Sequence, residues 1–221
     1  MSDEYEVSKQ NKVRQIREKA AYDKETVHGI IDSGLIAHVA FVQDGNPVVV
    51  PMLYGRDGET IYLHGARKAR IIRMLEQTEQ ASLNITIVDA LVLARSAFNS
   101  SMNYRSVTVF GKPTLIDDEE AKMHAMHVIT EHTMPGRWDE LRAPTDKEFK
   151  MTGIIALEIE AASAKISKKA APEDEEFDYD TPVWAGILPM ASSYQTLVDA
   201  DRLIEGVEPS EAVKALEGKT L

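Results

Sequence analysis

Two Asp-Gly turns constrain the fold of this chain more than any other feature of its sequence. Residues 35–65, LIAHVAFVQDGNPVVVPMLYGRDGETIYLHG, consist of runs rich in Val, Ile and Tyr that QDGNP and GRDGE separate. Asp-Gly pairs favour tight hairpin turns, and β-branched and aromatic residues favour strands. The segment therefore predicts an antiparallel meander of three strands.

The rest of the chain adds more strands than helices. Strand-like stretches cover residues 81–98, 103–116 and 152–167, and helical patterns cover residues 23–34, 66–77, 117–132 and 145–150. Strands that follow one another with few helices between them are not typical of a doubly wound parallel sheet. We therefore expect a mainly β (α+β) fold, an antiparallel split β-barrel of about six or more strands with flanking helices.

The two ends of the sequence differ from its middle. Residues 1–20 are polar and charged, which predicts a flexible N-terminal arm before a domain over residues 21–170. Residues 171–180, APEDEEFDYD, carry six acids and no base, as a solvated linker does. Apolar residues follow again around Trp184. Residues 171–221 are therefore expected to be an acidic linker, a docking segment and a short helix. The docking segment would pack on the chain's own core or on a neighbouring subunit.

Composition excludes several classes of function. A net charge of -11 argues against binding to nucleic acid or to an anionic membrane surface. No apolar run approaches the roughly 18 to 20 residues that span a bilayer, and the polar start of the chain does not resemble a secretory signal. We expect a cytoplasmic protein. With no cysteine, the chain has no disulfide, no thiolate metal site and no iron–sulfur cluster.

The stretch IYLHGARKAR, from Ile61 to Arg70, is the strongest candidate for a binding site. It predicts a strand, a turn and the start of a helix that carries cations. A helix that begins directly after a strand directs unpaired N–H groups at the turn, where they can bind phosphate. Gly65 and Ala66 permit close approach, and Lys68 or Arg70 could add charged hydrogen bonds. The alternative is that these cations form the solvated face of an amphipathic helix.

Histidine supplies the remaining candidates. His64 is the nearest to a catalytic acid or base because the pKa of histidine lies near neutrality, although a hydrogen-bonded structural role is the alternative. His124 and His127 share a helical face at i,i+3 spacing, with His132 farther around. Without a suitably placed carboxylate these three predict no metal site. His38 alternates with apolar residues in a strand, so it is expected to face the core or a dimer contact.

Seven motifs carry a resemblance to a known family. They follow one another from about Ala21 to Met190: AAYDKETV, HVAFV, LYGRDGETIYLHG, LVLARSAF, MNYRSV, PGRW and PVWAGILP. In this order they resemble the FMN-binding split-barrel family of pyridoxamine 5'-phosphate oxidase-like proteins. They are most similar to its branch of flavin-nucleotide-binding proteins related to nitroimidazole reductases.

The resemblance implies an FMN site in a groove at a homodimer interface. By this resemblance Arg70 would bind the phosphate, and a shifted alignment nominates Arg67 and Lys68 instead. Ser106 matches a position that contacts the flavin, with Tyr104 and Arg105 as weaker candidates. The residues that would border the ring and ribityl chain, or lie near the pocket, are Val49, Val50, Pro51, Met52, Leu53, His64, Gly65, Ala66 and Trp184.

The implied function is that of a flavin-dependent oxidoreductase. It would pass electrons from a reduced nicotinamide to a small acceptor such as a nitroaromatic or a quinone. A haem-binding or haem-degrading protein and a non-catalytic flavin carrier are the alternatives, and a deazaflavin could replace FMN. Oxidation of pyridoxamine 5'-phosphate itself is not expected, because Leu53 stands where those oxidases carry a cation. TPVWAGILPM also lacks their arginine and histidine pair.

Overall fold

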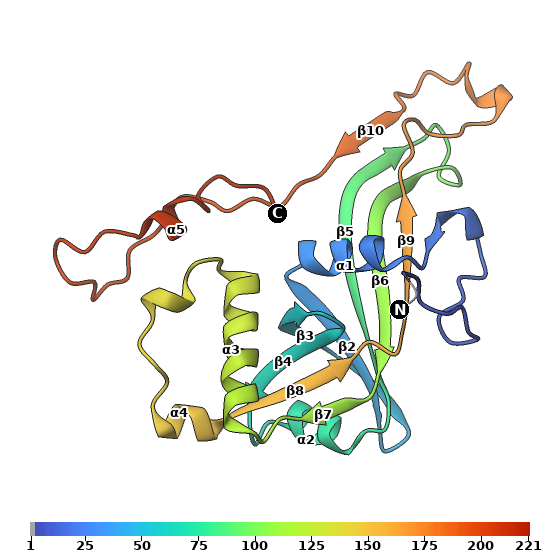
Figure 1. Cartoon of the computed structure of the whole chain (residues 1–221). Coiled ribbons are helices and arrows are strands. Elements are labelled where there is room, and N and C mark those ends of the chain that lie inside the picture. Colours follow the sequence, from blue (N-terminus) through green and yellow to red (C-terminus); the bar gives the residue numbers. More distant parts are fainter. Residues whose placement is uncertain (1–2) are drawn as a thin grey trace. The chain divides into compact units, whose positions relative to one another are not determined.

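The fold is mainly β, with antiparallel strands and flanking helices, as the sequence predicts (Figure 1). The computed structural model describes residues 3–221, which contain ten strands and five α-helices. The chain divides into two compact units. Unit 1 contains residues up to 34 together with 84–109 and 161–191, and unit 2 contains residues 35–83, 110–160 and 192–221.

Unit 1 is built on antiparallel strands. Their order is β1 (Ala20–Ala21), β9 (Ala161–Ser167), β6 (Ser101–Gly111) and β5 (Ala81–Leu93), and β10 (Gly186–Pro189) pairs with β5. Helix α1 (Lys24–Ser33) begins where predicted, because the side chain of Asp23 accepts a hydrogen bond from the Thr26 amide. The inner face of α1 buries Val27, Ile30 and Ile31. Short 3-10 helices cover Arg17–Lys19 and Glu176–Asp178.

Unit 2 contains the predicted meander. Its strand order is β2 (Ile36–Gln43), β3 (Asn46–Asp57), β4 (Thr60–Ala66), β8 (Thr152–Glu158) and β7 (Pro113–Leu115). Gly45 and Gly58 have φ of 76° and 56° in the two Asp-Gly turns, a conformation that glycine adopts without strain. The buried core includes Tyr54, Ile61 and Leu63.

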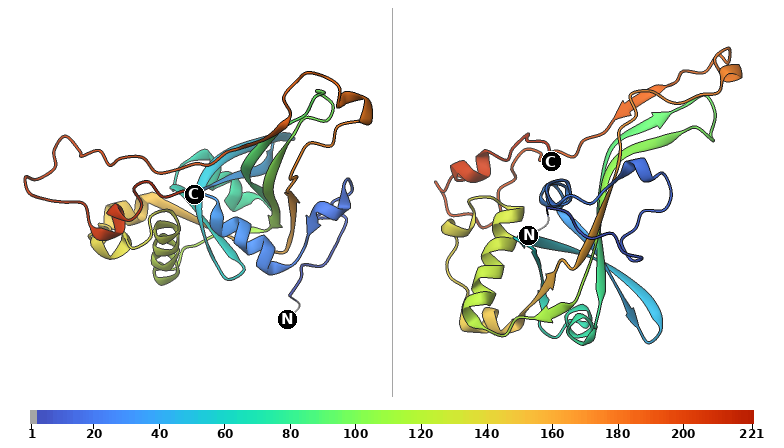
Figure 2. Two further views of the ribbon diagram at one scale, coloured as in Figure 1. Left: turned by 90° about the horizontal axis from the view of Figure 1, so that it is seen from above. Right: turned by 45° about the vertical axis from the view of Figure 1, so that its right-hand side comes forward.

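Unit 2 also contains helices. They are α2 (Arg70–Gln77), α3 (Glu119–Thr133), α4 (Asp146–Met151) and α5 (Glu211–Lys214), with a 3-10 turn at Trp138–Glu140. Of these, α2, α3 and α4 contact the strands of the unit. Helix α3 lies along β3 and β4 (Figure 2). It packs backbone to backbone on β3, because a Cβ added to Gly55 would lie 2.7 Å from the Val128 carbonyl oxygen. None of the helices in residues 3–221 has the length and apolarity that crossing a membrane requires.

Several predicted boundaries differ from the structure. The strand-like stretch over residues 81–98 ends as β5 at Leu93, and the stretch over residues 103–116 contains two strands, β6 and β7. The helix expected from residue 66 begins at Arg70, because Ala66 still pairs with Thr152 and the Arg67 amide donates to the Met151 carbonyl at 2.7 Å. The strand expected over residues 152–167 is two strands, β8 and β9. Between them the amides of Ile159 and Glu160 donate to the carbonyl oxygens of Glu59 and Phe110, which ends the ladder.

The segments predicted as arm and linker make specific contacts within unit 1. Asn11 is 2% exposed, and its Nδ2 donates to the carbonyl oxygen of Ala162 at 3.0 Å. In the acidic stretch, the fully buried side chain of Asp174 pairs with Arg95 at 2.8 Å. Asp174 is thus not solvated, and the flexibility of residues 1–20 stays a prediction.

Candidate functional site

Strand β3 changes its partner within unit 2. Residues Asn46–Leu53 pair with β2, and residues Tyr54–Asp57 pair with β4. Strand β4 leaves β3 after Leu63, and its last residues, His64–Ala66, pair with β8 on the other edge. The two strands diverge beyond the Tyr54–Leu63 pair, and among the described residues each then has one edge without a strand partner. Backbone N–H and C=O groups on such edges need partners, so the divergence can hold a polar ligand.

The predicted ring-bordering residues lie on one side of this divergence. Along β3 the side chains alternate, so that Met52 is buried and Val50 half-buried, while Val49 is 60% and Leu53 40% exposed. Pro51 is exposed beside them. The strand register places Ile36 opposite Leu53, His38 opposite Pro51 and Val42 opposite Pro47. We call the exposed side chains of Ile36, His38, Val42, Pro47, Val49, Pro51 and Leu53 the β2–β3 face.

The amino end of α2 follows the last residue of β4, Ala66, after a turn of three residues, and α2 contacts β4, β7 and β8. Its N-cap residue, Ala69, makes no side-chain capping hydrogen bond. Arg70 is the first residue of the helix, Lys68 lies two residues earlier, and both are exposed. Neither cation forms an ion pair within residues 3–221. Unpaired amides, the helix dipole and two free cations together make this end suitable for an anion.

Arg67 has a different role from Lys68 and Arg70. Its Nη1 and Nη2 donate to the two carboxylate oxygens of Glu76 at 3.0 and 3.1 Å. Its amide is bound to Met151, and a Cβ on Gly153 would lie 3.1 Å from its Cα. Arg67 thus joins the turn to the far end of α2 and to β8, and it is the least available of the three predicted phosphate ligands.

His64 lies at the end of β4, with its side chain exposed. Gly65 and Ala66 follow it in the same strand, and a Cβ on Gly65 would lie 3.2 Å from the Ile72 side chain, so this turn is packed closely on α2. Desolvation by the surrounding protein lowers the pKa of His64 below its ordinary value of 6.5. The neutral imidazole, with one donor and one acceptor nitrogen, is therefore favoured at neutral pH.

The other predicted flavin contacts belong to unit 1. Arg105 on β6 donates through Nε and Nη2 to the carboxylate of Asp89, at distances of 2.8 to 3.2 Å. The hydroxyl of Ser106 accepts from Asn84 Nδ2 at 3.1 Å and lies 2.9 Å from the hydroxyl of Thr86. Tyr104 is half-buried in the same strand. Trp184 is 68% exposed, and its ring covers Gly186, the first residue of β10.

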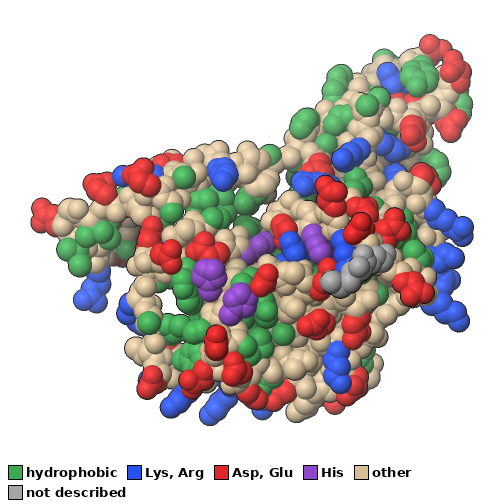
Figure 3. Space-filling view, viewed as in Figure 1, with side chains coloured by type: hydrophobic (Ala, Val, Ile, Leu, Met, Phe, Trp, Pro, Cys, Tyr) green, Lys and Arg blue, Asp and Glu red, His purple; other side chains and the backbone are tan. Residues whose placement is uncertain are grey.

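The histidines of α3 point to separate partners. His124 Nε2 lies 2.9 Å from Asp57 Oδ2 and its ring meets Tyr62 edge-on, whereas His127 meets the ring of Trp138 and His132 that of Tyr54. Figure 3 shows histidine side chains at the surface near α3. The described residues contain no group of three or more His, Asp or Glu side chains placed to hold a metal ion.

Two polar features in this unit were not anticipated from the sequence. Desolvation, then the charges of Asp57 and Glu158, raise the pKa of Tyr62. Lys122 is buried on the inner side of α3, where its Nζ donates to the Phe149 carbonyl at 2.6 Å and lies 4.4 Å from the centre of the Phe149 ring. Burial lowers the pKa of Lys122. No local sequence pattern predicts these contacts, because Lys122 and Phe149, and likewise Tyr62 and Glu158, are far apart along the chain.

The antiparallel fold and the divergence beside a helix end define a protein of the split-barrel class. The sequence profile described as pyridoxamine 5'-phosphate oxidase matches residues 23–166, which is more than half of the chain. The chain belongs to this family, as the motif resemblance predicts.

Solved structures support the assignment. The flavocytochrome Anf3 from Azotobacter vinelandii is 33% identical, with a TM-score of 0.88 over 96% of this chain and 98% of that one. The FAD and heme binding protein from Mycobacterium smegmatis is also 33% identical, with a TM-score of 0.85 over 90% and 98%. A putative 5-nitroimidazole antibiotic resistance protein from Bacteroides thetaiotaomicron is 24% identical, with a TM-score of 0.57 over 66% and 86%, and this likeness concerns the fold alone. No curated protein matches the sequence.

Proposed function

We propose that this protein is a flavin-binding redox protein. The observation that carries the proposal is that two relatives, each aligned over at least nine tenths of both chains, are described as a flavocytochrome and as an FAD and heme binding protein. The divergence between β3 and β4 and the uncapped end of α2 offer matching chemistry. At the divergence, β3 and β4 each have a backbone edge without a strand partner, and the amino end of α2 has unpaired amides beside Lys68 and Arg70.

Each part of this site has a separate task in the proposal. Lys68, Arg70 and the first amides of α2 bind the flavin phosphate through charged hydrogen bonds. The Val49–Leu53 segment of β3 borders the ring, and neutral His64 can exchange hydrogen bonds with a ligand. A bound flavin supplies the hydride and electron transfer, while the protein orients it and tunes its surroundings.

The proposed reaction passes electrons from a reduced nicotinamide to a small acceptor, such as a nitroaromatic or a quinone-like compound. Pyridoxamine 5'-phosphate oxidation is not proposed, despite the family's description. Leu53 stands at the position where a cation is expected, and Trp184–Pro189 contains neither arginine nor histidine. A fold hosts many reactions, so the site and not the fold has to name the reaction.

A haem beside the flavin is a second proposal, and the same two relatives support it. A neutral histidine is the usual protein ligand of haem iron. His38 and His64 are exposed, and their imidazole rings form no hydrogen bond in the described part of the chain, unlike the ring of His124, which is paired with Asp57. We therefore propose His38 and His64 as the candidate ligands.

A homodimer is the third part of the proposal. The β2–β3 face exposes Val42, Val49, Leu53 and Ile36 together on one side of two paired strands. A continuous apolar surface of this kind is typical of a protein interface. In the family resemblance, the flavin groove also lies between two protomers.

The cofactor is tested on freshly purified protein. We expect flavin absorption, release of an intact flavin nucleotide on denaturation, and bleaching of the flavin band by NADH or NADPH under anaerobic conditions. Mass spectrometry separates FMN, FAD and a deazaflavin, and a Soret band reports haem. Protein that is colourless and remains so after incubation with flavins and haem would overturn the proposal. Bound flavin that neither NADH nor NADPH bleaches would indicate a non-catalytic flavin carrier.

The phosphate ligand is tested by replacing Arg70 with alanine. We expect flavin binding to weaken by about 1.5 to 3 kcal/mol, the contribution of a charged hydrogen bond, in a fluorescence titration of the apoprotein. Arg73→Ala is the matched control, because Arg73 is exposed on the same helix but lies one turn beyond its amino end. Equal affinities of both variants and the parent protein would remove Arg70 from the site.

A further inference from the structure

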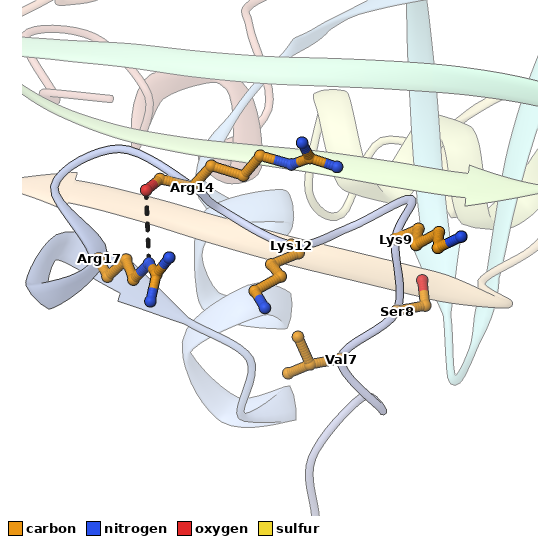
Figure 4. Close-up of a pocket in the computed structure, with 6 residues that line it drawn as sticks. All are labelled: Val7, Ser8, Lys9, Lys12, Arg14 and Arg17. Atoms are coloured by element: carbon orange, nitrogen blue, oxygen red, sulfur yellow. Dashed lines mark hydrogen bonds between the residues drawn. The ribbon is translucent and has the colours of Figure 1, made fainter.

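A hollow lined by cations lies in the N-terminal arm, within unit 1. It has a volume of about 440 Å³, and the residues around it are Val7, Ser8, Lys9, Lys12, Arg14 and Arg17 (Figure 4). In the close-up, Lys12 and Arg17 turn toward the space that the loop encloses. The flavin proposal uses none of these residues.

The four cations have no anionic partner in the part of the chain that the structure describes. Among residues 3–221, Lys9, Lys12, Arg14 and Arg17 form no ion pair, and Arg17 Nε makes only a long hydrogen bond of 3.4 Å to the Arg14 carbonyl. Residues 7–19 carry five Lys or Arg side chains and one acid, Glu18, although the chain as a whole carries a net charge of -11. In Figure 3, Lys and Arg side chains gather at the right-hand margin, where Figure 1 places the arm. Mutual repulsion of unpaired cations is relieved when an anion binds among them.

The loop that carries these cations is held in place. Asn11 Nδ2 donates to the carbonyl oxygens of Glu6 and Ala162, both at 3.0 Å, and Asn11 Oδ1 accepts from the amide of Ser8 at 2.7 Å. On the far side of the cations, Lys19 Nζ donates to Ser167 Oγ at 3.0 Å, and β1 pairs with β9. A loop fixed at both ends presents its cations with less loss of conformational entropy on binding than a free arm does.

We propose that this hollow binds a small ligand with two linked phosphate groups, such as the diphosphate of a nucleotide. The cations that line this hollow, of which Lys12 and Arg17 turn toward it, match the several charges of a diphosphate better than the charge of one carboxylate, and arginine can bind phosphate through paired hydrogen bonds. A compact ligand is favoured over nucleic acid, because the acidic remainder of the chain repels a long polyanion. This inference goes beyond the proposed flavin site at α2 and does not depend on it.

The test uses the full chain, purified with whatever cofactor it carries. Inorganic pyrophosphate and ADP are titrated calorimetrically at constant ionic strength, with sulfate as the single-anion comparison. We expect both diphosphates to bind, sulfate to bind at least tenfold more weakly, and Lys12→Gln/Arg17→Gln to reduce diphosphate affinity by about a hundredfold, or about tenfold for each charged hydrogen bond lost. Lys147→Gln/Lys150→Gln lowers the net charge equally on exposed residues of α4 and should bind as the parent does.

Several outcomes would overturn this inference. They are the absence of pyrophosphate and ADP binding, an equal loss of affinity in the α4 control, and sulfate binding as tightly as the diphosphates. A single-stranded oligonucleotide that outcompetes ADP would replace the small ligand with nucleic acid. Flavin content is measured in each variant by absorbance. Loss of flavin from Lys12→Gln/Arg17→Gln alone would assign the cations to the flavin and overturn the separate site, whereas an absence of flavin in every variant would overturn only the flavin proposal.

Discussion

Gly111, at the end of β6, leaves no room for even one methyl group. A Cβ at this position would lie 1.9 Å from the Glu158 carbonyl oxygen and 3.0 Å from the Leu157 side chain. The nearest atom belongs to the backbone of β8, so a flexible side chain cannot simply rotate away.

We expect Gly111→Ala to lower the free energy of unfolding by about 1 to 3 kcal/mol, as overpacking of a core does. Gly29→Ala is the matched control, because nothing lies within 4 Å of a Cβ there and Gly29 is inside α1. Alanine is a better helix former than glycine, so the control should stabilise the protein by up to about 1 kcal/mol. Urea unfolding measures both variants, and equal stabilities would contradict the close packing of Gly111 on Glu158.

At this scale the sequence identifies residue types better than their partners. It nominated Arg67, Lys68 and Arg70 as phosphate ligands, and Arg67 proves to be paired with Glu76. Glu76 lies nine residues after Arg67, near the end of α2, so the spacing of the cations alone does not show this contact. Buried Lys122 was missed because its acceptor, the Phe149 carbonyl, reaches it only after α3 and α4 have folded.

Helix α4 depends on one carboxylate for the start of its hydrogen-bond ladder. Glu148 accepts from the Thr145 amide at 2.8 Å in a capping box, and both of its oxygens bind the Arg142 guanidinium. The Arg142 side chain, then the Thr145 backbone and hydroxyl, hold the pKa of Glu148 well below its ordinary value of 4.5. The stabilisation is thus present above about pH 4.5 and is lost as the pH falls toward the lowered pKa.

We expect Glu148→Gln to be less stable than the parent protein at pH 7 and to approach it in stability as the pH falls below about 4. Glutamine keeps the capping acceptor but not the charge, so the difference reports the ion pair. Thermal unfolding at several pH values measures this, and Arg142→Gln should give the same pH dependence. A stability difference that does not change with pH would contradict the role of the charge.

Elements with local caps were predicted well. Asp23, Asp118 and Thr145 each cap the helix that follows them, and these are signals that lie within three residues of their target. The start of α2 was predicted too early, because the Arg67 amide donates a hydrogen bond to the carbonyl oxygen of Met151, a residue far along the sequence. The single strand predicted over residues 152–167 failed for the same reason, since distant carbonyl groups bind the amides at its middle.

The assembly of the whole molecule is the least accessible from one chain. The proposed homodimer uses the β2–β3 face, where an interface would cover side chains that are now exposed. Composition and motif order predicted the fold class and the family, both of which are confirmed. The homodimer partner, the electron donor and the electron acceptor are determined by contacts with other molecules, and these three stay predictions.

We expect Val49→Asp/Leu53→Asp to convert the proposed homodimer to a monomer, because a carboxylate in the centre of an apolar interface loses its hydration without gaining a partner. Light scattering after size-exclusion chromatography measures the mass, and circular dichroism checks the fold. Leu141→Asp changes an exposed apolar residue of a loop outside this face and should leave the dimer intact. A double variant that remains dimeric would place the interface elsewhere.

The change of partner at Tyr54 has a consequence for how proteins of this kind diverge. Main-chain amides and carbonyls are the same in every residue but proline, so a group bound at a free strand edge constrains side-chain identity only weakly. Substitutions of the exposed side chains of β3 can then change which molecules contact this strand without disturbing a group bound to its backbone edge. New specificities can then accumulate around an unchanged backbone edge, and shared ancestry becomes a poor guide to the reaction of a given member.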